Sequence, residues 1–136
     1  MPVESELPLK QAMTVSAPVF AVRTLKRGDK LGYGGLYSAD KDVKIGILRI
    51  GYYDGLPRAA KGAEVLINGK KTWIIGNVCM DFCFVNLDGI DAKVGDNAEI
   101  IGSGCDANKL ACHCGTIPYE ILMAFKGDRA NRILIK

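Results

Sequence analysis

The chain has 136 residues, 49% hydrophobic and 24% charged, which is typical of one ordinary globular domain with a substantial core. Eighteen Lys and Arg residues against fifteen Asp and Glu leave a net charge of +3, and this mild, dispersed excess argues against a nucleic-acid-binding protein. Because the sequence contains neither a run of eighteen apolar residues nor the pattern of a secretory signal, we expect a cytoplasmic protein without a membrane partner.

The first eight residues have a sequence that is typical of a linker. Segment 1–8 contains Pro2 and Pro8 and has no periodic apolar pattern. We therefore expect the chain to be one piece of a longer protein.

Most of the chain has the pattern of β-strands. Between residues 13 and 24 apolar and polar residues alternate, and Pro18 within this run predicts an edge strand or a bulge. Further strands are expected over 44–50, over 65–75 with a hairpin turn at Asn68-Gly69, over 81–87 and over 98–101. Short strands at this spacing predict an all-β, Greek-key-like barrel.

A glycine-rich segment follows the first strand. Residues 27–29 predict a turn, and segment 30–35 then places three glycines around Tyr33. So many glycines leave room for another group to approach the backbone.

Only the C-terminal third predicts helices, one or two of them and short. Asp106 could cap a helix over 108–112, and Thr116 could cap a second helix that reaches Phe125. Pro118 would be tolerated in the first turn of that helix, and Gly127 lies beyond its end. The last apolar run, 132–136, predicts a closing strand.

Few side chains could support catalysis unaided. His113 is the only histidine, so any nucleophilic triad would need it. With Cys105, Cys112 and Cys114 it could form a zinc site, or the thiols could simply be reduced. Structural zinc sites usually use C-x₂₋₄-C pairs, and adjacent helical residues point about 100° apart. The spacing therefore favours reduced thiols, and we expect no metal.

Five tyrosines lie in glycine-rich segments, in turns or at a helix start. Taken singly, an aromatic residue beside a turn is more often a packing residue than a functional one. These tyrosines are Tyr33, Tyr37, Tyr52, Tyr53 and Tyr119.

Four motifs that include these tyrosines occur in a recognisable order. They are Gly32-Tyr33-Gly34 with Tyr37, then Ile50-Gly51-Tyr52-Tyr53-Asp54-Gly55-Leu56-Pro57-Arg58, then Val78-Cys79-Met80-Asp81, then Gly115-Thr116-Ile117-Pro118-Tyr119-Glu120. In this order and spacing they resemble the C-terminal domain of alanine racemase, and the resemblance covers residues 9–136.

The resemblance implies a pyridoxal 5′-phosphate (PLP) enzyme that interconverts L-alanine and D-alanine for peptidoglycan. Such enzymes are head-to-tail homodimers, in which an N-terminal (β/α)₈ barrel holds the cofactor on a lysine and the β-domain of the partner subunit closes the site. Two bases move the α-proton, one being the cofactor lysine and the other a tyrosine that matches Tyr33. The chain alone, lacking the barrel, is expected to be inactive.

Other roles follow from the resemblance position by position. Met80 matches the residue whose backbone N–H meets the substrate carboxylate, and Tyr119 matches a tyrosine that reaches the cofactor phosphate. Tyr52 matches a residue that narrows the substrate passage, and Arg58 and Asp81 match polar residues further out. As simpler alternatives, Met80 could fill the core, Arg58 could be a surface charge and Asp81 a turn residue.

Three positions depart from the usual family pattern and leave the substrate open. Asn77 stands where an arginine is common, Pro118 where an asparagine is common, and Tyr53 where a small residue is usual. Loss of a cation near the passage would change how a carboxylate substrate is attracted. A serine or broad-specificity racemase, and a non-catalytic binding or regulatory β-barrel, therefore remain alternatives.

Overall fold

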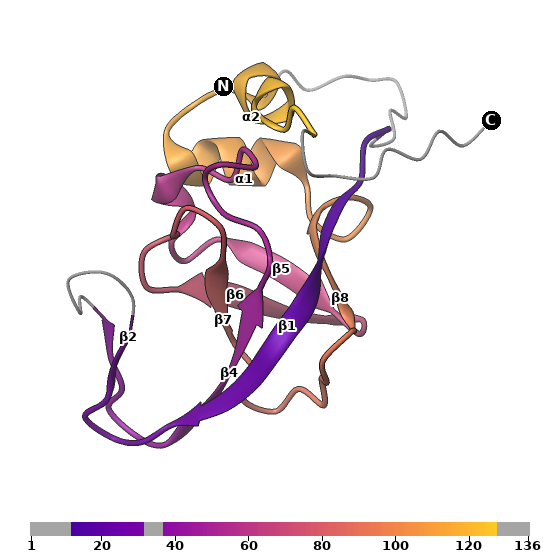
Figure 1. The fold of residues 1–136 in the computed structure, drawn as a ribbon. Coiled ribbons are helices and arrows are strands. Elements are labelled where there is room, and N and C mark those ends of the chain that lie inside the picture. The colour runs from indigo at the N-terminus through magenta and orange to yellow at the C-terminus, as the bar shows by residue number, and fades with distance from the viewer. Residues whose placement is uncertain (1–11, 32–36, 128–136) are drawn as a thin grey trace.

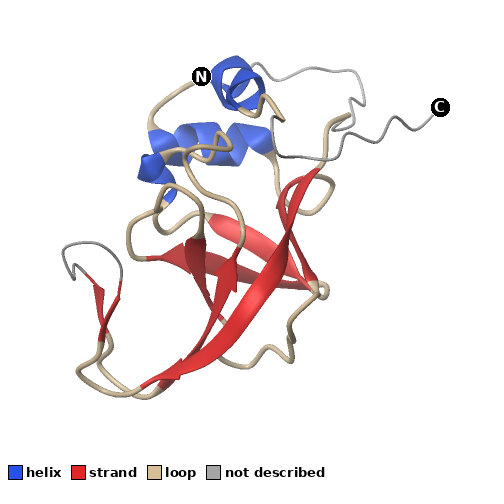
Figure 2. Cartoon of the chain, viewed as in Figure 1, coloured by secondary structure: helices blue, strands red, loops and turns tan. Residues whose placement is uncertain are grey.

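The structure is a computed structural model that describes residues 12–31 and 37–127. Figure 1 shows a β-barrel with short helices across one end and a hairpin that projects from its side. Within the described residues, six antiparallel strands close the barrel in the order β1-β4-β7-β6-β5-β8. Their bounds are Val15–Leu25 (β1), Val43–Leu48 (β4), Glu64–Ile67 (β5), Lys70–Ile75 (β6), Cys83–Asn86 (β7) and Asn97–Ile101 (β8). The predicted mainly-β barrel with short C-terminal helices is confirmed (Figure 2).

Pro18 lies in a bulged strand and not at a sheet edge. Strand β1 pairs with β8 through Val15 to Pro18 and with β4 from Val19 onward, and its register shifts between Val19 and Ala21. The carbonyl of Pro18 accepts a hydrogen bond from the N–H of Arg49 over 3.2 Å. A residue without an N–H is tolerated here because the strand changes partner at this point.

The hairpin turn predicted at Asn68-Gly69 is confirmed. Strands β5 and β6 pair directly on either side of it, with Ile67 opposite Lys70. Asn68 has φ 51° and Gly69 has φ 76°, the two positive values that a tight hairpin turn of the primed type requires.

The chain has two hydrophobic clusters. The larger one, the barrel core, fills the barrel interior and continues under the helices with Leu48, Leu56, Val65, Leu87 and Ile121 among its buried members. The smaller one is the hairpin cluster, formed by Leu31, Ala39, Val43, Ile45, Ile75, Cys79 and Phe84, with Tyr37 and Phe82 packed against it. Strands β2 (Lys30–Leu31) and β3 (Tyr37–Ser38) form the projecting hairpin, so the hairpin cluster ties this hairpin to the barrel.

Two helices follow the barrel strands. Helix α1 (Ala107–Cys114) begins as predicted, because the Asp106 side chain accepts a hydrogen bond from the Asn108 N–H over 2.8 Å. Helix α2 (Pro118–Ala124) begins after Ile117, so the predicted cap at Thr116 is wrong. Pro118 starts the helix with its fixed φ, while the Thr116 N–H donates to the Ala111 carbonyl at the end of α1.

The other predicted segments lie partly inside and partly outside the described residues. The turn at 27–29 is confirmed, with Gly28 at φ 90°. The linker-like segment 1–8, Tyr33 with its neighbouring glycines, and the expected strand 132–136 lie outside the described residues. The described helices, at eight and seven residues, are too short to cross a membrane.

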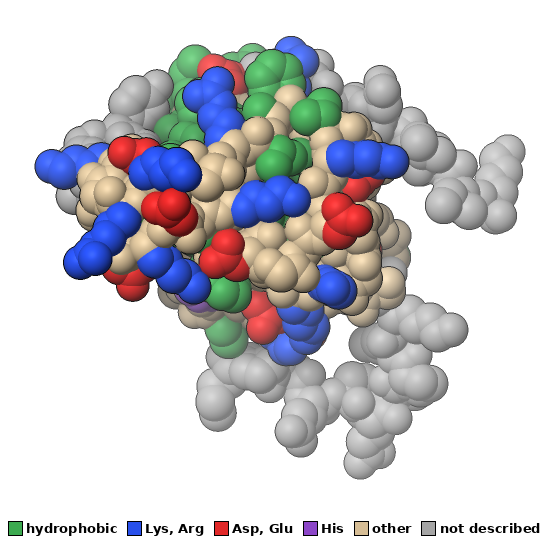
Figure 3. Space-filling view, turned by 90° about the horizontal axis from the view of Figure 1, so that it is seen from below, with side chains coloured by type: hydrophobic (Ala, Val, Ile, Leu, Met, Phe, Trp, Pro, Cys, Tyr) green, Lys and Arg blue, Asp and Glu red, His purple; other side chains and the backbone are tan. Residues whose placement is uncertain are grey.

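The barrel end away from the helices is covered by charged side chains of both signs. Figure 3 views the molecule from that side, and lysines, arginines and acidic residues are interspersed over the face. Because the two signs of charge alternate, this face does not produce the strong positive electrostatic potential that attracts a polyanion such as a nucleic acid.

Candidate functional site

The residues predicted to form the site are mostly at the surface. Tyr52 and Met80 are each 45% exposed and Tyr119 is 75% exposed. Arg58, the first residue of the 3₁₀ helix η2 (Arg58–Ala60), is exposed, and Asp81 is half-buried. Met80 is therefore not a core residue, which was the simpler alternative for it, and Tyr33, the predicted base, lies outside the described residues.

Two loops bring Tyr52 and Met80 together. Residues 51–57, here called the Tyr52 loop, follow β4, and residues 77–82, the Met80 turn, lie between β6 and β7. The Tyr52 N–H donates to the Cys79 carbonyl and the Tyr53 N–H donates to the Met80 carbonyl, each over 3.0 Å. Consecutive residues of one loop are thus bonded to consecutive residues of the other, which fixes their relative position.

The Tyr52 loop is also held from within. The Gly51 N–H donates to the Asp54 carboxylate over 3.0 Å, and the Asp54 and Leu56 N–H groups donate back to the Gly51 carbonyl. Leu56 is fully buried in the barrel core and anchors the loop. A loop closed in this way has few conformations left, so it presents Tyr52 and Tyr53 outward in a defined arrangement.

Helix α2 adjoins the other side of the Tyr52 loop. A β-carbon at Gly55 would lie 2.4 Å from the Ala124 carbonyl oxygen, so the loop packs directly against the end of this helix. Tyr119 lies in the first turn of α2, about 7.5 Å along the axis from Ala124 at 1.5 Å per residue. The structure thus brings Tyr52, Met80 and Asp81 together, with Tyr119 and Arg58 on adjoining elements.

One backbone group of the Met80 turn is available for a ligand. The Met80 carbonyl is used by Tyr53, but the Met80 N–H donates to no other residue within the described part of the chain. An N–H of this kind can donate a hydrogen bond to a carboxylate oxygen, and the side chain is not involved.

The hairpin that leads to Tyr33 packs beside the Met80 turn. Leu31 pairs with Tyr37, and a β-carbon at Gly76 would lie 3.7 Å from the Cβ of Tyr37. The base of this hairpin is held by Asp42, whose carboxylate accepts from the Arg27 N–H over 3.0 Å and from the Lys26 ammonium over 3.2 Å. The Arg27 N–H, followed by Lys26, lowers the pKa of this carboxyl below its ordinary value.

All five cysteines are free thiols, as predicted. Burial, with a smaller effect of Cys79, raises the pKa of Cys83 to about 12. Burial also raises the pKa of Cys105 and of Cys114. Neutral thiols are poor nucleophiles, so these three residues are unsuited to covalent catalysis near neutral pH.

His113 is bonded to the backbone. Its Nε2 contacts the Lys61 carbonyl oxygen, and a carbonyl can only accept, so Nε2 carries the proton and ties α1 to the residue after η2. Among the residues that the structure describes, no three His, Cys, Asp or Glu side chains converge on a metal position.

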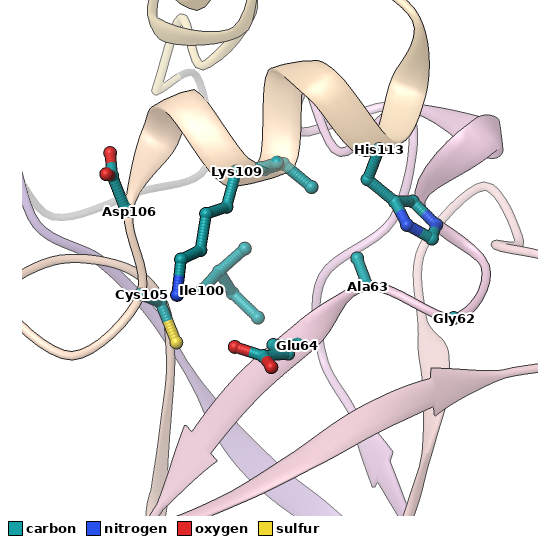
Figure 4. Close-up of a pocket in the computed structure, with 9 residues that line it drawn as sticks. Gly62, Ala63, Glu64, Ile100, Cys105, Asp106, Lys109 and His113 are labelled. Atoms are coloured by element: carbon teal, nitrogen blue, oxygen red, sulfur yellow. The ribbon is translucent and has the colours of Figure 1, made fainter. Parts of the chain in front are cut away.

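A pocket of about 290 Å³ lies away from the candidate site, between α1 and the strands β5 and β8 (Figure 4). Glu64, Cys105 and Lys109 project into it in Figure 4, with the His113 ring near Gly62 at the other side. No described residue of the predicted site lines this pocket. Glu64, which lines the pocket, is a surface residue. It pairs with Lys71 outside the pocket over 3.7 Å, and both side chains are more than half exposed.

The residues that organise the site lie within the motifs, but no role was predicted for them from the sequence. Gly51, Gly55 and Cys79 shape the contacts between the loops and α2, and Asp54 closes the Tyr52 loop. Asp54 had a local signal, because an aspartate three residues after Gly51 within a turn-forming stretch can cap that turn. The contacts of Gly51 and Gly55 join segments distant in sequence, so no local pattern shows them.

Comparison with known proteins places the chain in a family. The family model described as "Alanine racemase, C-terminal domain" matches residues 12–134. The alanine racemase of Vibrio vulnificus strain CMCP6 is 45% identical over 121 residues, 87% of this chain and 34% of that protein. The alanine racemase of Photobacterium profundum is 41% identical over 116 residues, 84% of this chain and 32% of that protein.

Solved structures agree with this assignment. Alanine racemase from Bacillus anthracis superposes with a TM-score of 0.89 at 32% identity, covering 96% of this chain and 34% of that one. The biosynthetic enzyme from Pseudomonas aeruginosa gives a TM-score of 0.88 at 37% identity, with 93% and 36% covered. The chain spans about one third of the length of these relatives. It belongs to the alanine racemase C-terminal domain family.

Proposed function

We propose that the chain is the C-terminal part of a PLP-dependent alanine racemase, interconverting L-alanine and D-alanine in the cytoplasm and supplying D-alanine for peptidoglycan. The observation that carries this proposal is the paired backbone contact between Tyr52–Tyr53 and Cys79–Met80. It joins the segment that the resemblance assigns to the substrate passage to the segment assigned to the substrate carboxylate. The names of the relatives support alanine as the substrate.

The described residues fit a supporting role toward the cofactor. When bound, PLP supplies an electron sink that makes the α-proton of an amino acid acidic. The exposed phenol of Tyr119 can donate a hydrogen bond to a phosphate, and the Met80 N–H can donate to the substrate carboxylate. Every described lysine is exposed or half-buried, so we assign the cofactor lysine, which needs an enclosed pocket, to the N-terminal barrel domain.

Tyr33 is the proposed base on one face of the substrate. An ordinary tyrosine has a pKa near 10, so to act as a base near neutral pH it must belong to a proton relay, whose other members the resemblance places on the N-terminal barrel domain. Support comes from the stems of its hairpin, Leu31 and Tyr37, which pack beside Gly76 at the start of the Met80 turn. A base at the end of that hairpin would therefore belong to the same assembly as Met80 and Tyr52.

The partner proposed is the N-terminal barrel domain of a second subunit in a head-to-tail homodimer. Helix α2 buries Ile121 but leaves Ile117, Tyr119 and Met123 between 56% and 77% exposed. Tyr52, Tyr53 and Met80 are exposed as well, on the two loops, and the Tyr52 loop packs against the end of α2. Surfaces of this kind usually mark protein interfaces, and the chain alone should then be inactive.

The test uses this chain joined to, or mixed with, the N-terminal domain of an alanine racemase. Racemisation of alanine should appear in the combined protein and be absent from the 136-residue chain alone. Tyr33→Phe should lower turnover by about 10²-fold or more, the usual contribution of a positioned base. Tyr37→Phe, on the same hairpin, is the matched control and should retain most activity.

The same assay separates the alternatives. Equal turnover of serine and alanine would favour a broad-specificity racemase. Failure of every combined protein to racemise any amino acid, although folded and cofactor-loaded, would favour a non-catalytic domain. Full activity of Tyr33→Phe in both directions would overturn the assignment of the base.

A further inference from the structure

Cys79 lies at the junction between the hairpin and the Tyr52 loop. It is 1% exposed and belongs to the hairpin cluster, together with Leu31 of β2 and Phe84 of β7. Its carbonyl oxygen points the other way, toward the Tyr52 loop, and accepts from the Tyr52 N–H over 3.0 Å. One residue therefore contacts both segments, the first through its side chain and the second through its backbone.

The backbone around Cys79 leaves little freedom. Its N–H donates to the Phe82 carbonyl over 3.0 Å and closes the Met80 turn. Its thiol lies 3.7 Å from the Asn77 carbonyl oxygen, within reach of a weak S–H donor. Gly51 approaches so closely that a β-carbon there would lie 2.3 Å from the Cys79 carbonyl oxygen. Any shift of Cys79 must therefore move the Tyr52 loop.

The side chain at this position must be small and apolar. It packs in the hairpin cluster, where Phe82 and Phe84 also meet edge to face with ring centroids 5.5 Å apart. A larger residue would push the Met80 turn toward Gly51, and a smaller one would leave a void beneath the hairpin. Cysteine behaves as a small hydrophobe in such a place, and no reactivity is required of it.

We propose that Cys79 is a positioning residue that couples the hairpin β2–β3 to the Tyr52 loop, so that both keep one arrangement relative to the Met80 turn. The coupling itself stands on the contacts above. Its consequence for catalysis rests on the proposed function, because only there do Tyr52 and the hairpin serve one reaction.

Hydrogen exchange on the 136-residue chain tests the coupling without any activity. The reporters are the Tyr52 N–H, bonded to Cys79, and the Ala39 N–H, bonded to the Asp29 carbonyl at the base of the hairpin. Cys79→Ala should accelerate exchange at both amides by about tenfold, because loosened packing lowers the cost of local opening. If this variant does not fold, Cys79→Ser keeps the size of the side chain but places a hydroxyl in the apolar hairpin cluster, and it should also accelerate exchange at the same two amides.

Cys83→Ala is the matched control. Cys83 is fully buried four residues further on, but it lies in the barrel core. Its truncation should lower the melting temperature. The exchange rates of the Tyr52 and Ala39 amides should stay within about threefold of those in the unmodified chain. A change at only one of the two amides in Cys79→Ala, or the same pattern in Cys83→Ala, would overturn the coupling.

Kinetics of the combined racemase then test the catalytic consequence. Cys79→Ala should alter KM through the Tyr52 loop and kcat through the hairpin, each by about threefold or more, whereas Cys83→Ala should alter neither. An exchange effect with unaltered kinetics would overturn the catalytic role. Inactivity of the unmodified combined protein would instead count against the proposed function and would leave the exchange result standing.

Discussion

Gly51 lies so close to Cys79 that a β-carbon at position 51 would be 2.3 Å from the Cys79 carbonyl oxygen and 2.4 Å from that of Met80. Backbone atoms cannot swing aside as a side chain can, so Gly51→Ala must push the Tyr52 loop off the Met80 turn. We expect a loss of about 1–3 kcal/mol in unfolding free energy and a raised KM for alanine. Urea unfolding and steady-state kinetics of the combined racemase measure these two effects.

Gly89→Ala is the control for the glycine substitution. Gly89 has φ 72° with open space around it, so alanine there costs only the backbone strain of about 1–2 kcal/mol. Its KM should remain that of the unmodified protein. A Gly51→Ala variant with unchanged KM would show that the contact between the two loops does not shape the site.

The Met80 N–H provides a second prediction. Because the proposed contact uses the backbone, Met80→Ala should keep KM within about threefold, since the N–H remains. Met80→Pro removes that N–H and should raise KM by about tenfold or more, the usual loss for a hydrogen bond to a charged group. Melting curves of both variants are needed, because a proline could also disturb the turn. A large effect of Met80→Ala with a normal melting curve would show that the side chain matters instead.

Much of the barrel could be predicted because its determinants are local. Asn68-Gly69 fixes a hairpin through two positive φ angles, and Asp106 caps α1 with its own carboxylate. Thr116 was expected to cap α2, but its N–H donates to the Ala111 carbonyl at the end of α1, and Pro118 starts the helix. A rule that considers only neighbouring residues does not include this contact with α1.

The assembly of the site could not be derived from local pattern. The resemblance identified Tyr52 and Met80 separately, whereas their contact depends on how β4, β6 and β7 lie in the barrel. The hairpin cluster was missed for the same reason. Ile45, Ile75 and Phe84 are on barrel strands but are buried by a hairpin outside the barrel, so alternation alone does not reveal their partner.

Tyr53 provides a third prediction, about substrate size. It stands where the family usually has a small residue, it is 56% exposed, and its N–H is fixed to the Met80 carbonyl. Because Tyr53 follows Tyr52 in the same loop, we expect its exposed ring to narrow access for larger amino acids. Tyr53→Ala should raise kcat/KM for serine relative to alanine by about tenfold, within the range that steric selection in a pocket provides. An unchanged serine-to-alanine ratio would place Tyr53 outside the passage.

The hairpin base provides a prediction about pH. The pKa of Asp42 is lowered below its ordinary value of 3.8, first by the Arg27 N–H and then by Lys26. A lowered folded-state pKa means that the contribution of this carboxylate is complete above pH 3.8 and is lost as the pH falls through the folded value. The Arg27 amide signal in NMR spectra should therefore titrate with a midpoint below 3.8, as its acceptor is protonated.

The turn at Asp96 tests whether this acid response is local. The pKa of Asp96 is lowered in the same direction by Asn68 and by the Lys93 N–H, at a site remote in sequence from the hairpin. Asp42→Asn should abolish the acid titration of the Arg27 amide and spare that of the Lys93 amide, and Asp96→Asn should do the reverse. If both amides instead changed together in either variant, acid would be opening the whole barrel, and the Asp42 carboxylate would not be what holds the hairpin base.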